Sequence, residues 1–384
     1  IVATDGAGSG AIVYEMDDLE LAGNLAVGGE LSTPSAGTSN FRAGVNAGNS
    51  ITSGGNYNVV VGDEAGTALT TGDNNVAIGF EALKTEDANG DNVAVGYQAL
   101  KTLNAGANAS NTAIGYTAGT AMTTGVRHVL IGGLAGKALT SGDKNIAIGY
   151  SALQSDTLGS RSVAIGHDAL QAQNFTTATT AYNVAVGEAA GLSVTTGAYN
   201  TFLGGQAGDG STGGSNNVAV GYNTLSANAD TNFNVAIGSN AMVAQNEAGR
   251  NVAVGYNALT ADTKGGRNVA VGFGTLQASN QTTVTTAYNV AVGYDAGVSV
   301  TTGTQNVLIG GLSGDAITTG ANNVAMGTSS LGTCTTGAYN VALGDSALFA
   351  TTTASNNTAV GGGALTANTT GASNVAVGRS ALGA

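Results

Sequence analysis

A phrase of nine residues, NVAVGYNAL at residues 251–259, recurs throughout the chain. Nineteen copies can be aligned on the asparagine, and fifteen of the eighteen intervals between them are 17 residues long. The exceptions are one interval of 19 residues and two of 21. A period this short and constant is typical of a solenoid, in which each repeat forms one coil and buries its apolar face only when a neighbouring coil stacks on it.

The repeats fill residues 40–384, and a fainter copy, NFRAGVNAG from Asn40, marks the predicted start of the array. Residues 1–39 form a separate N-terminal segment, in which 19–31 follow the register of a fibre shaft and Pro34 lies in a linker. With 62 Gly, 1 Pro and 42% hydrophobic residues, the composition suits β-structure with tight turns. We therefore predict an all-β fold, a parallel β-solenoid or β-roll of about 17 residues per coil.

Residues that could carry chemistry are few. The formal charge is −13, and the 11 Lys and Arg are scattered along the sequence, so no nucleic-acid partner is expected. No apolar run approaches the roughly 18 residues of a spanning helix, so no membrane insertion is expected. His128 and His167 occupy different repeat positions, and Cys334 has no histidine near it in the sequence. We predict no catalytic residue, no metal site and no cofactor, and therefore no enzyme.

Alternation within the repeat predicts which side chains share a face of the strand. Numbered from the asparagine, positions 2 and 4 are aliphatic in nearly every copy, so they are expected to face the coil interior. Position 3 then faces outward, and because it is Ala in fifteen copies we expect it to touch a second chain at close range. The predicted interchain face consists of Ala77, Ala94, Ala219, Ala253, Ala270, Leu130, Phe202 and Leu308.

Positions 1 and 5 indicate the shape of the coil. Position 5 is Gly in all nineteen copies, which indicates a corner with φ > 0 or with no room for a Cβ. The asparagines at position 1 are expected to form a ladder, with side-chain amides bonding from coil to coil at the strand spacing of about 4.8 Å. The predicted ladder includes Asn75, Asn92, Asn145, Asn217, Asn251, Asn268, Asn323 and Asn374.

Correlated substitutions indicate how each coil is filled. Where position 9 is Gly, an apolar residue such as Leu69 usually appears at position 12, whereas Leu or Met at position 9 usually has no such companion. The two classes look like alternative fillings of one interior slot, with Gly208 as an exception. Where position 3 is bulky, at Leu130, Phe202 and Leu308, position 6 is Gly. We interpret this second pair as a compensation of volume.

Two long intervals carry nearly identical loops, at residues 171–183 and 277–289. Loops on a rigid scaffold commonly carry binding, so these loops are the first candidates for contact with a receptor or glycan. Duplication without function is the alternative. The candidate contact residues are Asn174, Phe175, Tyr182, Asn280, Gln281 and Tyr288.

The phased motif N-V-A-[VI]-G resembles the head repeat of trimeric autotransporter adhesins. The longer phrase N-x-A-[IV]-G-Y-x-A-L, with T-T-G-x-x-N, resembles repeats of bacteriophage tail fibres. This resemblance covers about residues 40–384 and implies a parallel β-roll in which three chains pack side by side around an axis. The sequence contains no anchor barrel or coiled-coil stalk of the kind a complete autotransporter adhesin has, which favours the phage fibre.

We therefore expect a structural protein, the rigid trimeric spacer of a phage tail fibre, located outside the cell on a virion. Its expected partners are further copies of the same chain and a host-surface glycan or receptor. The alternatives are the head of a bacterial surface adhesin and a self-assembling extracellular filament, in which chains would also associate end to end. An ice- or glycan-binding solenoid is more remote, because Thr-Thr-Gly occurs in only some coils.

Overall fold

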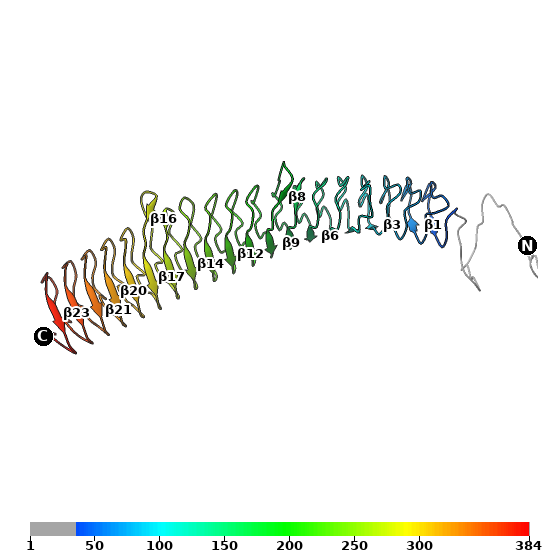
Figure 1. Ribbon diagram of the computed structural model, residues 1–384. Helices are drawn as coiled ribbons and strands as arrows, with labels where there is room; N and C mark the ends of the chain where they lie inside the picture. The colour runs from blue at the N-terminus through cyan, green and yellow to red at the C-terminus, as the bar shows by residue number, and fades with distance from the viewer. Residues whose placement is uncertain (1–35, 384) are drawn as a thin grey trace, which may run out of the picture.

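The computed structural model describes residues 36–383, which form one elongated stack of coils (Figure 1). These residues contain no helix, and successive turns of the chain add strands to one parallel sheet. The parallel β-solenoid of about 17 residues per coil that the repeat predicts is confirmed. The expected shaft-like segment at 19–31 and the linker around Pro34 lie outside the described residues.

The main sheet has twenty strands of three residues, each paired in parallel with its counterparts in the neighbouring coils. Each repeat position lies beside the same position of the next coil, as Ala236 does beside Ala253. At the usual strand spacing the stack is about 90 Å long. The strands are β1 (Phe41–Ala43), β2 (Val59–Val61), β3 (Val76–Ile78), β4 (Val93–Val95), β5 (Thr112–Ile114), β6 (Val129–Ile131), β7 (Ile146–Ile148), β9 (Val163–Ile165), β11 (Val184–Val186), β12 (Thr201–Leu203), β13 (Val218–Val220), β14 (Val235–Ile237), β15 (Val252–Val254), β17 (Val269–Val271), β19 (Val290–Val292), β20 (Val307–Ile309), β21 (Val324–Met326), β22 (Val341–Leu343), β23 (Thr358–Val360) and β24 (Val375–Val377).

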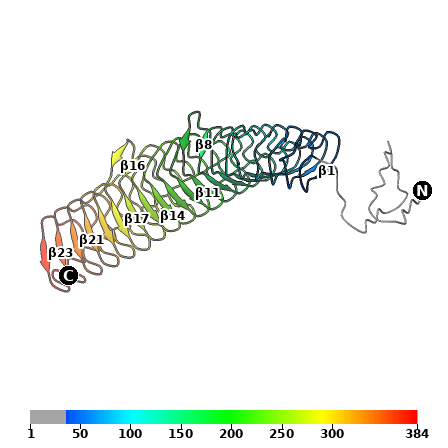
Figure 2. The ribbon, with the colours of Figure 1, turned by 45° about the vertical axis from the view of Figure 1, so that its right-hand side comes forward.

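Two small parallel sheets accompany the two loops of the 21-residue intervals. One pairs β8 (Gly159–Ser160) with β10 (Thr179–Thr180), and the other pairs β16 (Gly265–Gly266) with β18 (Thr285–Thr286). Around β8 and β16 the chain projects beyond the outline of the rod, as two views of the molecule agree (Figures 1 and 2). The inserted residues therefore widen individual coils and leave the stacking of the main sheet unbroken.

The strands face the opposite way from the prediction. Position 3 is the buried member of each triplet from β2 onward, and positions 2 and 4 are partly or largely exposed. The alanines at 77, 94, 219, 253 and 270 are fully buried inside their own chain, as are the bulkier residues at 130, 202 and 308. The prediction that this column forms an interchain face is wrong. Alternation separates two faces without saying which is inner, and a coil this narrow has room for alanine there rather than for two aliphatic chains.

Most coils hold one large apolar side chain in the interior slot, supplied from position 9 or position 12, and the 19-residue coil holds one from each position. Leu83 and Leu259 fill the slot from position 9 and are fully buried. Leu69 fills it from position 12, and a Cβ on Gly66 at position 9 would lie 2.8 Å from the Cδ1 of Leu69. The interpretation of the two classes as alternative fillings of one slot is therefore confirmed.

Bulky residues at position 3 are accommodated by glycine at position 9, not at position 6. Cβ atoms added to Gly119 or Gly136, at position 9 of two successive coils, would each lie 2.8 Å from a methyl group of Leu130. By contrast, a Cβ on Gly133 at position 6 would meet only the ring of Tyr150, on the outside of the coil. The interpretation that position 6 compensates for position 3 is wrong, because the two side chains lie on opposite sides of the backbone.

The same geometry explains Gly208, the exception to the slot pattern. A Cβ on Gly208 would lie 2.5 to 2.7 Å from three ring atoms of Phe202, so this ring occupies the space that a position 12 side chain fills elsewhere. Position 12 of that coil is the small Ser211, which is fully buried. An aromatic residue at position 3 therefore replaces the missing apolar anchor.

The invariant glycine at position 5 satisfies both conditions that its constancy suggested. Gly255 has φ of 139°, and a Cβ there would lie 2.2 Å from the carbonyl oxygen of Gly272, the equivalent residue one coil later. Any side chain at this corner would therefore be strained and would also force neighbouring coils apart.

We expect Ala253→Leu to destabilise the protein, because Met242 and Leu259 fill the interior from position 9 on either side and leave no space for three further non-hydrogen atoms at position 3. Overpacking of this kind costs about 1–3 kcal/mol. Val60→Leu is the matched control, since Gly48 and Gly66 stand at position 9 around it, and we expect it to be near neutral. Denaturant unfolding of both variants tests this, and an equal loss would contradict the slot model.

Candidate functional site

The outer face of the main sheet is a continuous apolar surface. Positions 2 and 4 point outward along all twenty strands and are almost entirely Val, Ile, Leu or Met. Examples are Val292, 37% exposed, Met326, 43% exposed, and Leu203, 47% exposed. Because the coils are in register, these side chains form two parallel rows along the rod, which we call the apolar face. This face, rather than the alanine column, is the surface of the sheet that another molecule could cover.

An exposed aromatic row at position 6 flanks the apolar face. Phe80, Tyr97 and Tyr116 stack with ring centroids 5.4 and 5.3 Å apart. Tyr256 and Phe273 stack at 5.2 Å, and Tyr294 continues that stack at 5.4 Å. His167 takes the same position and stacks on Tyr150 at 5.5 Å. The row thus extends the non-polar area of the sheet toward one corner of each coil.

The asparagines of position 1 form a hydrogen-bonded ladder in the interior of the rod. Asn251 Oδ1 accepts a hydrogen bond from the backbone N–H of Asn268 at 2.8 Å, and its Nδ2 donates to the carbonyl of Gly265 at 2.9 Å. Amide-to-amide bonds, such as Asn323 Nδ2 to Asn306 Oδ1 at 3.2 Å, are secondary. Each predicted ladder residue donates its backbone N–H to the ladder side chain of the preceding coil, namely Asn75, Asn92, Asn145, Asn217, Asn251, Asn268, Asn323 and Asn374.

His128 replaces asparagine in this ladder and reproduces both of its bonds. Its Nδ1 accepts from the backbone N–H of Asn145 at 3.2 Å, and its Nε2 lies 2.6 Å from the carbonyl oxygen of Gly142. This pair of partners requires the neutral tautomer with hydrogen on Nε2. Burial lowers the pKa of His128, which favours the same neutral form.

Ser162 is too short to reach its ladder partner, and Gln173, at position 12 of the same coil, spans the gap to the next ladder residue. Gln173 Nε2 donates to Ser162 Oγ at 3.1 Å, and Gln173 Oε1 accepts from Asn183 Nδ2 at 2.8 Å. Both residues are fully buried. The polar column therefore continues through the first inserted coil.

The candidate contact residues of the two loops differ in accessibility. Tyr182 and Tyr288 are 47% and 50% exposed, and Asn280 is also exposed. Phe175 and Gln281, which occupy equivalent places in the two loops, are each 5% exposed and pack inward. Their assignment as contact residues is therefore wrong. Asn174 is partly buried and accepts a hydrogen bond from Thr157 Oγ1 at 3.0 Å.

Each of the three long coils is anchored by a buried carboxylate at position 12 of the preceding coil, a feature that the sequence analysis missed. Asp156 Oδ1 accepts from the backbone N–H of Gly159 and of Phe175, both at 3.1 Å. Asp262 Oδ2 accepts a hydrogen bond from Ser279 Oγ of the long coil at 3.4 Å. Glu86 Oε2 accepts a hydrogen bond from the backbone N–H of Ala105 at 3.4 Å.

The sequence signal for these anchors was an acidic residue at position 12, a repeat position that is apolar or uncharged in the other coils. Glu86, Asp156 and Asp262 are fully buried, and this burial raises the pKa of each carboxyl group. Their hydrogen bonds to backbone N–H groups partly oppose that rise. These carboxyl groups hold the long coils in shape from inside the rod.

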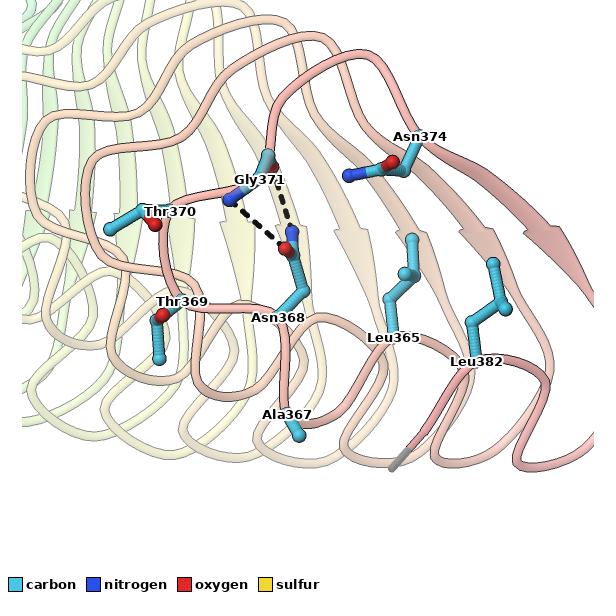
Figure 3. Close-up of a pocket in the computed structure, with 8 residues that line it drawn as sticks. All are labelled: Leu365, Ala367, Asn368, Thr369, Thr370, Gly371, Asn374 and Leu382. Atoms are coloured by element: carbon cyan, nitrogen blue, oxygen red, sulfur yellow. Dashed lines mark hydrogen bonds between the residues drawn. The ribbon is translucent and has the colours of Figure 1, made fainter.

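A hollow of about 330 Å³ lies at the C-terminal end of the described coils (Figure 3). Leu365, Asn368, Asn374 and Leu382 line it, and they occupy positions 9, 12, 1 and 9 of their repeats. These are the interior columns that the next coil covers everywhere else in the stack. Asn368 and Gly371 bond to each other there, at 2.9 and 3.1 Å. The hollow is thus a cross-section of the solenoid core.

Residues 36–383 bring no three His, Cys, Asp or Glu side chains together in a group that could hold a metal ion. Over the same range, no helix has the length and apolarity needed to cross a membrane. Cys334 is buried at position 12, where it fills part of the interior slot, and burial raises the pKa of its thiol.

Comparison with known proteins identifies no family for this chain. No protein-family model matches the chain, and no curated protein matches its sequence.

We expect Asn251→Ala to destabilise the protein by roughly 3 kcal/mol, because the Asn268 N–H and the Gly265 carbonyl would be left buried without partners. Asn246→Ala is the matched control, since that side chain is exposed and outside the ladder, and it should change stability by less than about 0.5 kcal/mol. Denaturant unfolding monitored by circular dichroism compares the two. Similar values would show that the ladder contributes little.

We expect protonation of His128 to lower the stability of the folded protein in acid. Its folded-state pKa lies below the ordinary value of 6.5, so the stabilisation from the neutral ring is present above that value and is lost as pH falls through the folded-state pKa. A proton on Nδ1 would displace the hydrogen bond from Asn145. His128→Asn should therefore reduce the loss in Tm between pH 7.5 and pH 5, whereas the exposed His167→Asn should not. Equal losses in both variants would contradict the assignment.

Proposed function

We propose that this chain is a segment of a rigid extracellular fibre formed by copies that associate side by side through the apolar face. The observation that carries the proposal is the continuity of that face over the twenty strands of the main sheet. The coil does not require an aliphatic side chain at position 2, since Thr is accepted there at 112, 201 and 358, whereas position 4 is Val, Ile, Leu or Met in every copy. A covering partner explains why the aliphatic residues predominate.

The area of the apolar face supports a stable association. About forty outward side chains, each exposing a few tens of Å², give on the order of 1,500 Å², whereas specific interfaces bury about 800 Å² per partner. A soluble monomer rarely exposes a contiguous apolar patch of more than a few hundred Å². The surface is therefore large enough to be an interface in its own right.

A further copy of the chain is the partner that best matches this surface. The rows of the apolar face repeat at the strand spacing of about 4.8 Å over the length of the rod. Only a partner with the same rise per repeat can keep its side chains in phase with these rows over many coils. A second copy of the chain has the same rise per coil. Two copies in register therefore keep their outward side chains in phase over the whole length of the rod.

The rigid rod and the resemblance of its motif to phage tail-fibre repeats support a trimeric fibre spacer as the specific assembly. A structure of stacked coils with interior columns has few flexible joints, which suits a spacer that transmits force. The resemblance of the same motif to adhesin heads keeps a bacterial surface adhesin as the second candidate. In both settings the apolar face is the working surface between chains, and the loops are free for contact with a host.

Sedimentation of the unheated chain tests the assembly. We expect a discrete mass near three times 37.1 kDa. Val254→Glu with Val292→Glu places two charges on the apolar face and should shift the mass to that of one chain. Ser141→Glu with Asn246→Glu adds the same charge at exposed positions away from the sheet and should leave the trimer intact.

Circular dichroism of both double variants checks that the solenoid remains folded. A wild-type chain that stays monomeric at all concentrations would contradict the proposal. An open-ended series of masses would instead support the self-assembling filament.

A further inference from the structure

We propose that the chain binds an acidic polysaccharide at the edge of the rod beside its second inserted loop. The site is formed by four exposed side chains from four successive coils, each directly before a ladder asparagine. We call these residues the binding row, and they are Phe233, Arg250, Arg267 and Tyr288. The inference concerns the flank of the rod, so it does not depend on whether copies associate through the apolar face.

The binding row places two guanidinium groups between two aromatic rings. The guanidinium carbon of Arg250 lies 5.5 Å from the ring centroid of Phe233, and that of Arg267 lies 5.5 Å from the centroid of Tyr288. Arg267 Nη1 also donates to Tyr288 Oη at 3.0 Å. Because equivalent positions stack in register, successive members of the row stand about 4.8 Å apart along the rod. The aromatic partners hold both cations along the edge.

The two arginines lack carboxylate partners. In the part of the chain that the structure describes, no Asp or Glu oxygen lies within 4.0 Å of Arg250 or Arg267. Lys84, Lys101 and Lys264 do have such partners, at 2.7, 2.6 and 3.3 Å. Two adjacent unpaired cations in a chain of net charge −13 repel each other. An anion placed between them would remove this repulsion.

Two adjoining hollows give a ligand room beside the row. One, of about 180 Å³, is lined by Phe233, Glu247 and Arg250 among others. The other, of about 220 Å³, is lined by Glu247, Arg250, Arg267 and the loop residues 284–286. The negative charge of Glu247 is offset by its ion pair with Lys264 at 3.3 Å. Asp230 also lines the first hollow, so the three cations Arg250, Arg267 and Lys264 stand against two carboxylates and the net charge of the site is positive.

This combination selects an anionic sugar chain. A guanidinium group binds a carboxylate or sulfate through two parallel N–H bonds, which is the geometry that lysine cannot supply. Aromatic rings at both ends of the row offer flat apolar surfaces for the C–H faces of sugar rings. A polymer with one acidic group on each successive sugar can bind both arginines at the same time, each through its own acidic group. A small anion brings only one acidic group to the pair.

The same arrangement occurs 106 residues earlier in the chain, beside the first inserted loop. Lys144, Arg161 and Tyr182 correspond there to Arg250, Arg267 and Tyr288. Arg161 Nη1 donates to Tyr182 Oη at 2.5 Å, and the guanidinium carbon lies 5.5 Å from that ring centroid. Because Lys144 replaces an arginine and Arg127 replaces the phenylalanine, we expect this copy to bind more weakly.

Binding of the full chain to three immobilised polymers tests the proposal. These are oligogalacturonate with carboxylates, dextran sulfate with sulfates, and neutral dextran. We expect binding to one or both acidic polymers and none to neutral dextran. Arg250→Gln with Arg267→Gln should weaken binding about tenfold, the equivalent of 1.4 kcal/mol. Lys137→Gln with Arg379→Gln is the control of equal charge change at other exposed positions, and it should change affinity less than twofold.

Preference between the carboxylated and sulfated polymers identifies which acidic group the row takes. Tyr288→Leu should weaken binding to the polymer without affecting thermal unfolding, because the ring is exposed. The proposal is overturned if no acidic polymer binds, or if both double variants lose affinity equally. It is also overturned if single-stranded DNA of equal charge binds as tightly, since that would show general attraction to polyanions.

Discussion

Strict self-stacking of the repeat is the constraint on which the rest of this structure depends. Every residue of a regular coil lies beside its own equivalent in the next coil, because parallel strands of three residues pair in fixed register. A residue type that suits one coil therefore has to suit contact with itself. The ladder at position 1 meets this condition, since an asparagine side chain can accept from one backbone group and donate to another. Gly255 and its equivalents meet it by having no side chain at a corner where coils approach within van der Waals contact.

Because the interior of each coil is narrow, self-stacking also limits the volume of the side chains that can point inward. Most coils have room for small residues at positions 3 and 8 and for one large apolar residue from position 9 or 12. Leu130, Phe202 and Leu308 are tolerated because glycine stands at position 9 in two successive coils around each of them. Polar residues enter the same columns only with partners, as His128 and Gln173 do. Before each long coil, position 12 carries a buried carboxyl group that accepts backbone N–H hydrogen bonds, while a leucine still fills the interior from position 9 of the same coil.

The exterior of the rod separates into surfaces with different chemistry. The apolar face and its aromatic row lie over the strands, and they provide area without directional polar groups. The residues before the ladder asparagines form an edge where basic and aromatic side chains gather beside the inserted loops. The proposed side-by-side assembly and the proposed binding of an acidic polymer therefore use different, neighbouring surfaces of the rod. Because the coils repeat, both surfaces extend along the rod. The loops of the two 21-residue intervals change the shape of the edge at two places.

The sequence by itself determined the period, the β-solenoid, the position of the glycine corner and the alternative fillings of the interior slot. Each of these follows from a pattern that repeats along the chain, and local physics fixes its meaning. Tertiary structure alone decided which face of the strand points inward, because alternation at positions 2, 3 and 4 is symmetrical with respect to the two faces. It also decided that Phe175 and Gln281 are buried. Finally, it brought Arg250 and Arg267 into one row with aromatic neighbours, since residues 17 to 21 apart become adjacent only when coils stack.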